Sequence, residues 1–413
     1  MAYTETTYTE TKSTSWFSRL GSSFRGVVFG IILLIAGTVV LWWNEGNFVG
    51  TGDALREAQA VTGELGDISK VDSAKNGQMV HATGPAATKD MLSDSVFGLS
   101  INAIRLERSV EFYQWTESSR SEKRQKLGGG EETVTTYTYA AKWTNRPVDS
   151  SAFKSPQART QNRNTVLMPL DNLKVQAGNV TFGAYRLPEF LINAIGGAAP
   201  LNVVLSKEAE DRLNTQLTRA AQGSGAAGMV HVGGNTVLLS ASPHAPQVGD
   251  VRVAFKETRP GAVSILAKLN GDTFERYRAR NGQTVSELSM GTHSLENMYG
   301  DAHSSNVVVT WLLRGGGTLA VIFGLAMIAA PLAVLAGVIP LLGSIVGAGA
   351  GIVSTLLGLA WSLVVISIAW LRFRPLIGIC MLAVSGILIV LLYRKGRARK
   401  AAHAQATAKT ASA

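Results

Sequence analysis

Two long stretches of this chain consist almost entirely of apolar residues. The first is GVVFGIILLIAGTVVLWW, within residues 24–43, and its only charged position is Arg25 at its edge. The second lies between Arg314 and Arg372, where 57 residues include no Asp, Glu, Lys, Arg or His. About 20 apolar residues cross a hydrocarbon layer ~30 Å thick. The first stretch therefore predicts one membrane span, and the second is long enough for two.

Prolines and a short polar corner set the boundaries of the later spans. Pro331 and Pro340 mark the break inside the long apolar block, and the corner Arg-Phe-Arg-Pro follows that block. These breaks predict three further spans, at residues 312–333, 346–370 and 376–393. The first run, at residues 24–43, exceeds the apolar region of a signal peptide and ends in paired Trp residues rather than a small-residue cleavage site. We therefore expect it to be an uncleaved span.

The segment between the first and second spans, residues 44–311, has the pattern of a water-facing domain. Residues 104–116 (IRLERSVEFYQWT) and 133–143 (TVTTYTYAAKW) alternate in a period of two, which is typical of half-buried strands. The charged, glycine-closed stretch at 117–132 between them predicts a long-looped hairpin. The runs VRVAF and AVSILAKL flank Arg259-Pro260-Gly261, a turn signal between two more strands.

One amphipathic helix interrupts these strands. Its apolar residues recur at four-residue steps, at Leu205, Ala209, Leu213 and Leu217. The expected fold class is therefore an integral membrane α-helical bundle of four spans that carries a large mixed α+β, strand-rich extracytoplasmic domain.

Composition and charge agree with this division. Hydrophobic residues make up 46% of the 413 residues and charged residues only 16%, against about a quarter charged in an average soluble domain. The net charge is +10, but residues 44–313 hold 27 basic and 27 acidic residues. The excess of basic residues lies at the ends and beside the spans, which excludes a nucleic-acid footprint and describes membrane topology. The one cysteine, Cys380, cannot form an intramolecular disulfide.

The two tails predict the orientation. Residues 1–23 are rich in Thr and Ser and predict a disordered cytoplasmic tail. Residues 394–413 form a basic tail, and basic residues close to a span stay on the cytoplasmic side. Four spans then leave both termini cytoplasmic and residues 44–311 in the periplasm or a lumen. The tail's cations either contact anionic lipid or act only as a topology signal; they are Arg394, Lys395, Arg397, Arg399 and Lys400.

Three charged residues are expected at one membrane surface. Glu45 follows the first span, Arg314 lies at the start of the second, and Arg374 lies in the corner between the third and fourth. A partly desolvated carboxylate and guanidinium there can pair and fasten the bundle. The alternative is that each long side chain extends separately to the head-group level.

Small residues at helical spacing indicate close packing of the spans. They lie one turn apart on one face, and small residues let helix backbones approach where lipid supplies no hydrophobic drive between helices. The candidate packing residues are Gly26, Gly30, Gly343, Gly347 and Gly351. The sequence contains no nucleophile elbow, zinc motif or phosphate-binding loop, so we expect no catalytic residue, cofactor or metal.

Several local motifs and their order resemble those of the transmembrane protein 43 family, also called LUMA. The features are a first span that ends in Asn44-Glu45-Gly46, a large middle region and three C-terminal spans. The most specific motifs are EFYQW, at residues 111–115, and WLRFRP, at residues 370–375. Others are MVHATGP, YTYAAKW, VGDVRVAF, VSILAKLNGD and TWLLRGGG.

This resemblance implies a scaffold of internal membranes that associates with itself and with other membrane proteins, and it implies no established catalytic residue. The compartment would be the endoplasmic reticulum and nuclear inner membrane in a eukaryote, or the inner membrane in a bacterium. The expected partners are the lipid bilayer, further copies of the chain and other membrane proteins. The alternatives are a channel or transporter component and, less favoured, a membrane enzyme.

Overall fold

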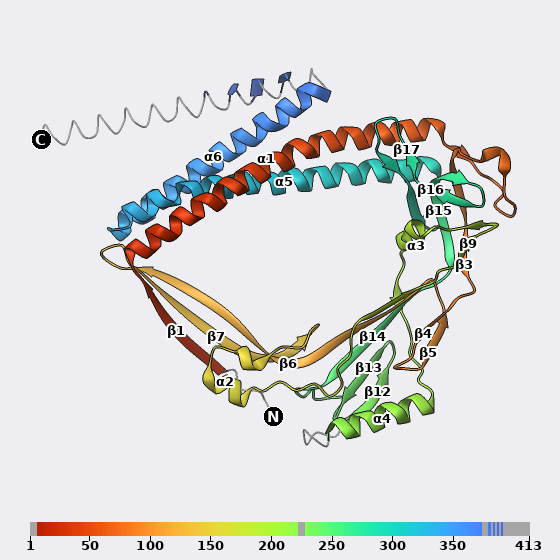
Figure 1. The fold of residues 1–413 in the computed structure, drawn as a ribbon, viewed down its shortest axis with the longest axis horizontal. Helices are drawn as coiled ribbons and strands as arrows, with labels where there is room; N and C mark the ends of the chain where they lie inside the picture. The colour runs from red at the N-terminus through yellow and green to blue at the C-terminus, as the bar shows by residue number, and fades with distance from the viewer. Residues whose placement is uncertain are drawn as a thin grey trace, which may run out of the picture. The chain divides into compact units, whose positions relative to one another are not determined.

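The computed structural model describes residues 6–221 and 228–373, together with the helical residues 379, 380, 383, 384, 386, 387 and 390. The chain forms two compact units (Figure 1). We call the first the strand-rich unit; it comprises residues 1–10, 56–122 and 134–300. The second, the helical unit, comprises residues 11–55, 123–133 and 301–413.

The first sheet of the strand-rich unit has eight strands. Their order is β1-β7-β6-β14-β13-β12, with β11 paired to β14 and β8 paired to β6. In the antiparallel pairing of β6 with β14, Val110 lies opposite Val253, and both are buried. The strands are β1 (Thr6–Thr14), β6 (Arg105–Gln125), β7 (Glu131–Thr144), β8 (Leu173–Gln176), β11 (Ala199–Pro200), β12 (Met229–Gly233), β13 (Thr236–Ser240) and β14 (Val251–Thr258).

The second sheet closes on itself. Its order is β19-β15-β16-β10-β9-β3-β2, and the additional pairing of β15 with β3 makes a ring of β15, β16, β10, β9 and β3. The strands β2 and β19 lie outside this ring and pair with β3 and β15. The rings of Phe182, Tyr185 and Phe274 pack together there, with centroids 6.2 and 5.4 Å from Phe274. The strands are β2 (Gly63–Glu64), β3 (Met79–Thr88), β9 (Val180–Phe182), β10 (Tyr185–Arg186), β15 (Gly261–Asn270), β16 (Thr273–Glu275) and β19 (Glu287–Met290).

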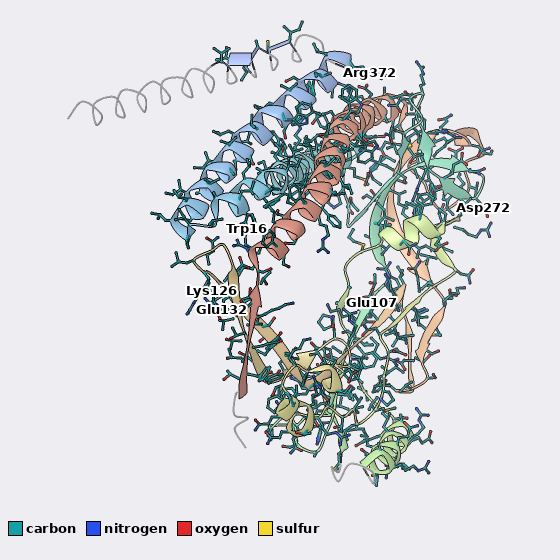
Figure 2. The ribbon with its side chains drawn as sticks, turned by 60° about the vertical axis from the view of Figure 1, so that its left-hand side comes forward. Trp16, Glu107, Lys126, Glu132, Asp272 and Arg372 are labelled. Carbon is teal, nitrogen blue, oxygen red and sulfur yellow. The ribbon has the colours of Figure 1, made fainter. Side chains whose placement is uncertain are left out.

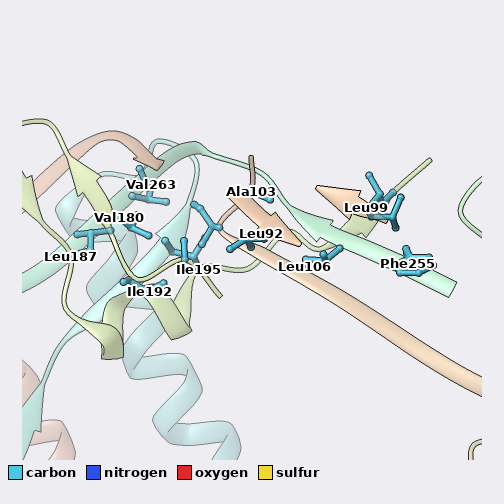
Figure 3. Close-up of a cluster of buried hydrophobic side chains, with 14 of the residues drawn as sticks. Leu92, Leu99, Ala103, Leu106, Val180, Leu187, Ile192, Ile195, Phe255 and Val263 are labelled. Carbon is cyan, nitrogen blue, oxygen red and sulfur yellow. The ribbon is translucent and has the colours of Figure 1, made fainter. Parts of the chain in front are cut away.

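Short elements and one continuous apolar core complete this unit. Two small hairpins pair β4 (Met91–Asp94) with β5 (Leu99–Asn102) and β17 (Tyr277–Arg278) with β18 (Thr284–Val285). The helices are α2 (Pro156–Gln161), α3 (Glu189–Ala194) and α4 (Lys207–Ala221), with 3₁₀ turns at Ser73–Lys75 and Ser150–Ala152. The core joins residues of both sheets and α3 (Figure 3). The amphipathic helix predicted from the sequence is α4, which buries Ala209, Leu213 and Leu217.

The helical unit contains three long helices, α1 (Trp16–Val61), α5 (Leu295–Ala336) and α6 (Pro340–Phe373). Each has a window long and apolar enough to cross a membrane. The spans expected at 24–43, 312–333 and 346–370 lie inside these helices. Pro331 does not end α5 as expected, and only Pro340 marks the break, as the first residue of α6. The span expected at 376–393 falls largely outside the described residues.

Three expectations about the strands differ from the structure. Residues 6–14 of the expected disordered tail form β1, because its Thr residues suit a strand and β7 supplies its pairing partner, and residues 16–23 form the first turns of α1. The expected loop at 117–132 is mostly strand, since β6 runs to Gln125 and β7 starts at Glu131. The turn at Arg259 and Pro260 does not make a hairpin; it carries the chain from β14 in the first sheet to β15 in the second.

A buried ion pair ties β4 to β6 inside the strand-rich unit. Arg108 Nη1 lies 2.7 Å from Asp94 Oδ2, and the side chains are 8% and 1% exposed. Asp94 also accepts hydrogen bonds from the backbone N–H groups of Val96 and Phe97, and Arg108 donates to the carbonyl of Asp171. The buried Asp94–Arg108 pair therefore connects the turn that follows β4 with the long strand β6.

Replacing Asp94→Ala leaves the Arg108 charge buried without its carboxylate. We expect the free energy of unfolding to fall by about 3–5 kcal/mol, the range found when one partner of a buried ion pair is removed. Chemical denaturation of the full chain in detergent, followed by circular dichroism of the strand signal, measures this. Asp272→Ala is the control, because the Asp272–Arg186 pair is exposed (52% and 71%) and should change stability by less than about 1 kcal/mol.

Candidate functional site

The most unusual polar group in the helical unit is the carboxylate of Glu45 on α1. Its side chain is fully buried, and it forms two parallel hydrogen bonds with Arg314 of α5. Arg314 Nε donates to Oε1 at 2.6 Å, and Nη2 donates to Oε2 at 2.7 Å. This bidentate geometry is the strongest arrangement available to a guanidinium and a carboxylate. Residues 269 positions apart in the sequence thus form one centre.

The third helix, α6, completes this centre through Trp370. The Trp370 indole N–H donates to Glu45 Oε2. The guanidinium carbon of Arg314 lies 4.9 Å from the ring centroid of Trp311, 5.8 Å from that of Phe48 and 5.9 Å from that of Trp370. A cation within about 6 Å of an aromatic ring centroid is attracted by the ring. The charge of Arg314 is therefore met by a carboxylate and by aromatic rings from all three helices.

Amide side chains continue the polar contacts between α1 and α5. Asn44 Nδ2 donates to the carbonyl of Thr310 at 3.3 Å, and Asn306 Nδ2 donates to the carbonyl of Phe48 at 3.0 Å. Asn44 is 1% exposed, so its hydrogen bond is made away from water, where an unpaired amide is costly. These bonds explain the structural role of the Asn-Glu pair that ends the first apolar run.

Glycines bring the same two helices close together at two further points. A Cβ on Gly30 would lie 2.7 Å from the carbonyl oxygen of Gly324, and one on Gly37 would lie 2.8 Å from that of Gly317. Real Cβ atoms do not approach oxygen that closely, so these positions require glycine. The two pairs are seven residues apart on each helix, with the antiparallel direction that the ion pair also has.

The helix α6 joins this seam at two further points. A Cβ on Gly358 would lie 2.5 Å from Ile322 Cγ1 of α5. The Trp361 indole N–H donates to Thr38 Oγ1 of α1 at 3.0 Å. The polar centre at Glu45 is thus one end of a three-helix contact that continues toward the middle of the helices.

The other predicted packing glycines have looser surroundings than Gly30 or lie outside the contact between α1 and α5. Gly26 is loosely packed, with Met327 Cε 4.0 Å from its Cβ position, and Gly347 is 3.6 Å from Ala333 Cβ. Gly343, in the first turn of α6, packs on Gly337 of the α5–α6 connection. Among the described residues, nothing lies within 4 Å of a Cβ placed on Gly351. The following predicted residues fall outside the described part of the chain: Arg374, Arg394, Lys395, Arg397, Arg399 and Lys400.

Sequence reasoning missed Trp370, Phe48 and Trp311. Aromatic residues near the ends of apolar runs are common at membrane interfaces, so their positions carried no signal for a buried contact. The one feature that pointed to Trp370 was the motif WLRFRP, of which it is the first residue. The motif singled out this segment, but it did not indicate that Trp370 contacts Glu45.

The comparisons with known proteins identify the family. A family model described as Transmembrane protein 43 matches residues 112–375, which is more than half of the chain. The chain belongs to the Transmembrane protein 43 family. That match covers most of the strand-rich unit together with Arg314 and Trp370 of the buried centre.

Relatives in this family match the chain over most of its length. Transmembrane protein 43 of Rattus norvegicus is 26% identical over 371 residues, 87% of this chain and 88% of that protein. The Homo sapiens protein is 25% identical over the same shares. The Transmembrane protein 43 homolog of Drosophila melanogaster is 28% identical over 369 residues, 86% of this chain and 90% of that protein. No solved structure matches the chain.

The buried pair predicts a large effect from a small substitution. Glu45→Gln removes the negative charge while keeping the size of the side chain, so Arg314 is left buried with an incomplete partner. We expect the helical unit to lose about 3–5 kcal/mol of stability. Unfolding in mixed detergent micelles, followed by tryptophan fluorescence, measures the loss. Glu208→Gln on the exposed face of α4 is the control, and equal melting of both variants would contradict the role of Glu45.

The close contacts of α1 with α5 at Gly30–Gly324 and Gly37–Gly317, which we call the glycine seam, give a second, independent prediction. Gly324→Ala places a methyl group against the Gly30 carbonyl and the Leu34 backbone, so α1 must move away from α5, at a cost of about 1–3 kcal/mol. Gly316→Ala is the matched control on the same helix, since nothing lies within 4 Å of its Cβ position among the described residues. The same unfolding assay should separate the two variants. If both retain wild-type stability, the close approach of the two helices is wrong.

Proposed function

We propose that this protein is a non-enzymatic multipass membrane scaffold, which self-associates and organises other membrane proteins through its large strand-rich unit. Membership of the Transmembrane protein 43 family supports a membrane role. The observation that carries the proposal is the way the buried charges are used. Trp370 of α6 donates to Glu45, and aromatic rings of all three helices lie near Arg314, so we infer that Glu45 and Arg314 stabilise the bundle rather than serve a substrate.

The proposed topology has four spans, with the fourth at residues 376–393 and both termini in the cytoplasm. Residues 44–311 are then mainly extracytoplasmic, in the periplasm of a bacterium or the lumen of a eukaryotic endoplasmic reticulum and nuclear envelope. Support comes from the basic residues that flank the first span and follow the fourth. The level of the buried pair agrees with this, since Glu45 ends the first apolar run and Arg314 begins the second.

Self-association is proposed to use α6 rather than α1. Gly30 and Gly37 already contact α5 within the chain, so that glycine face is occupied. Gly349 and Gly351 of α6 have no described atom within 4 Å of their Cβ positions. Large apolar side chains beside them are exposed, including Ile352 at 61% and Val353 at 53%. Glycines on an exposed apolar helix face permit close packing of a second copy.

The test is chemical cross-linking in native membranes followed by mass spectrometry. We expect cross-linked copies of this chain, and partner proteins linked to residues of the strand-rich unit. Gly351→Leu should reduce the cross-linked self-associated species several-fold, because a large side chain blocks the approach of a second helix. Gly315→Leu, at an equally open glycine of α5, is the matched control and should leave self-association unchanged.

The outcome separates this proposal from its alternatives. Cross-links to copies of this chain without any partner protein would contradict the organising role. Ion flux through reconstituted vesicles that Glu45→Gln abolishes would favour a channel or transporter component, because charged residues within spans commonly line such paths.

A further inference from the structure

The small hairpin of β17 and β18 in the strand-rich unit carries a local excess of positive charge. Its segment, residues 276–286 (RYRARNGQTVS), contains three arginines and no acidic residue, although residues 44–313 as a whole hold 27 basic and 27 acidic residues. Exposure alternates along it: Arg276, Arg278 and Arg280 are exposed, whereas Tyr277 is half-buried and Ala279 is buried. We call the three arginines the basic ridge.

The hairpin is held firmly against the last turns of α1 (Figure 1). The Tyr277 hydroxyl donates to Glu57 Oε1 of α1 at 2.9 Å, and the Arg280 backbone N–H donates to the same carboxylate oxygen at 3.2 Å. The Ala279 N–H donates to the carbonyl of Gln283 at 2.9 Å, which closes the turn. A ligand of the ridge therefore meets a backbone that is already ordered, so binding loses less conformational entropy.

The basic ridge differs from the neighbouring strands in how its cations are paired. Arg186 of β10 lies 3.0 Å from Asp272, and Lys268 of β15 lies 2.6 Å from Glu275. Figure 2 shows Asp272 at the outer surface of the strand-rich unit. Within the described part of the chain, none of the three ridge arginines forms an ion pair with a carboxylate. Their charge is left for a ligand from outside the chain.

The spacing and surroundings of the ridge arginines suit carboxylates on an extended chain. Alternate residues of an extended strand point to the same face and lie about 6.6–6.8 Å apart, which is the relation of Arg276 to Arg278. The guanidinium carbon of Arg276 lies 4.9 Å from the ring centroid of Phe190 on α3. This contact attracts the cation but supplies no acceptor oxygen, so a carboxylate can still accept hydrogen bonds from Arg276.

The position of the hairpin along α1 separates the ridge from the lipid. The helix runs without interruption from Trp16 to Val61, and Glu57, which holds the hairpin, lies 13 residues beyond Asn44 at the end of the first apolar run. At 1.5 Å per residue this is a rise of about 20 Å. A head-group layer is only about 5–8 Å thick, and charges are screened over about 8 Å at physiological ionic strength. A protein therefore suits the ridge better than a lipid surface does.

We propose that the basic ridge is a docking surface for an extended acidic segment of a partner protein. Carboxylates at alternate positions of that segment pair with Arg276 and Arg278, and a further one pairs with Arg280. Paired hydrogen bonds between guanidinium and carboxylate supply the geometric specificity. The inference rests on the proposed organising role of the strand-rich unit, and it names the place and the chemistry of the contact.

The first experiment measures binding of a synthetic peptide to the full-length protein in detergent micelles. The probe is a fluorescein-labelled decapeptide of alternating Glu and Thr, followed by fluorescence anisotropy. We expect the triple variant Arg276→Gln, Arg278→Gln, Arg280→Gln to bind it about tenfold more weakly, since three exposed ion pairs together contribute a factor of that order. Unchanged affinity overturns the proposal. Circular dichroism of the variant checks that its strands are intact.

Two matched controls separate the ridge from general attraction to a basic protein. The triple variant Lys207→Gln, Arg219→Gln, Lys256→Gln removes the same charge from other exposed positions of the strand-rich unit and should keep the wild-type affinity. An equal loss of affinity in both triple variants overturns the ridge as a specific site. A second peptide of the same composition, with all its Glu residues in one block, should bind the wild-type protein severalfold more weakly. Equal binding of the two peptides contradicts the strand spacing.

Cross-linking in native membranes separates this inference from the proposed function. We expect the ridge variant to lose partner cross-links of the strand-rich unit severalfold and the control variant to keep them. Partner cross-links that persist unchanged in the ridge variant overturn the ridge and leave the organising role standing. Absence of partner cross-links from the wild-type protein contradicts both.

A lipid ligand gives a different result. The wild-type protein in phosphatidylcholine nanodiscs is mixed with vesicles that contain phosphatidylglycerol, and we expect no association that depends on the ridge. Vesicle binding by the wild-type protein that the ridge variant loses, without binding of the acidic peptide, would assign the ridge to anionic lipid and overturn the protein partner.

Discussion

The arrangement of the helical unit depends on one requirement, that the carboxylate of Glu45 find a partner away from water. An ionised side chain in an apolar interior costs several kcal/mol unless it is paired and hydrogen-bonded. Arg314 and the Trp370 indole N–H supply those bonds from α5 and α6. If α5 slid by one turn along α1, both charges would be buried without partners. The ion pair thus sets the register of the two helices, and the tryptophan adds the third helix to the same point.

The glycine seam makes that register compatible with close packing. Dispersion contacts between helices grow only when the backbones approach, since lipid chains are as apolar as the helix side chains. Gly30 and Gly37 face Gly324 and Gly317 at the distance that the ion pair imposes. The Glu45–Arg314 pair therefore selects one register of α1 and α5. The glycines allow the two backbones to pack closely in that register. This packing also explains why these glycines are unavailable to a second copy of the chain.

The strand-rich unit is stabilised by different physics. In water, burial of apolar surface drives folding, and one continuous core links both sheets. The additional pairing of β3 with β15 closes five strands into a ring, while the Asp94–Arg108 pair holds a small hairpin against the long strand β6. Buried ion pairs thus occur in both units, but in the helical unit the pair sets the order of whole helices.

The sequence by itself determined the three apolar helices, the strand-rich character of residues 44–311 and the amphipathic helix α4. These features depend on local periodicity and on the length of apolar runs, which can be read without knowing what lies nearby. It also placed Glu45, Arg314 and Arg374 at one membrane surface as candidate partners, because all three flank apolar runs, but it did not decide whether any of them pair.

Only the tertiary structure decided the rest. It added Trp370 to the buried pair, paired β1 with β7 and placed β14 and β15 in different sheets. Each of these contacts joins segments whose local patterns suit several partners equally well. The physical reason is that a local pattern specifies what a segment can bury, whereas its actual partner is fixed by the packing of the whole chain.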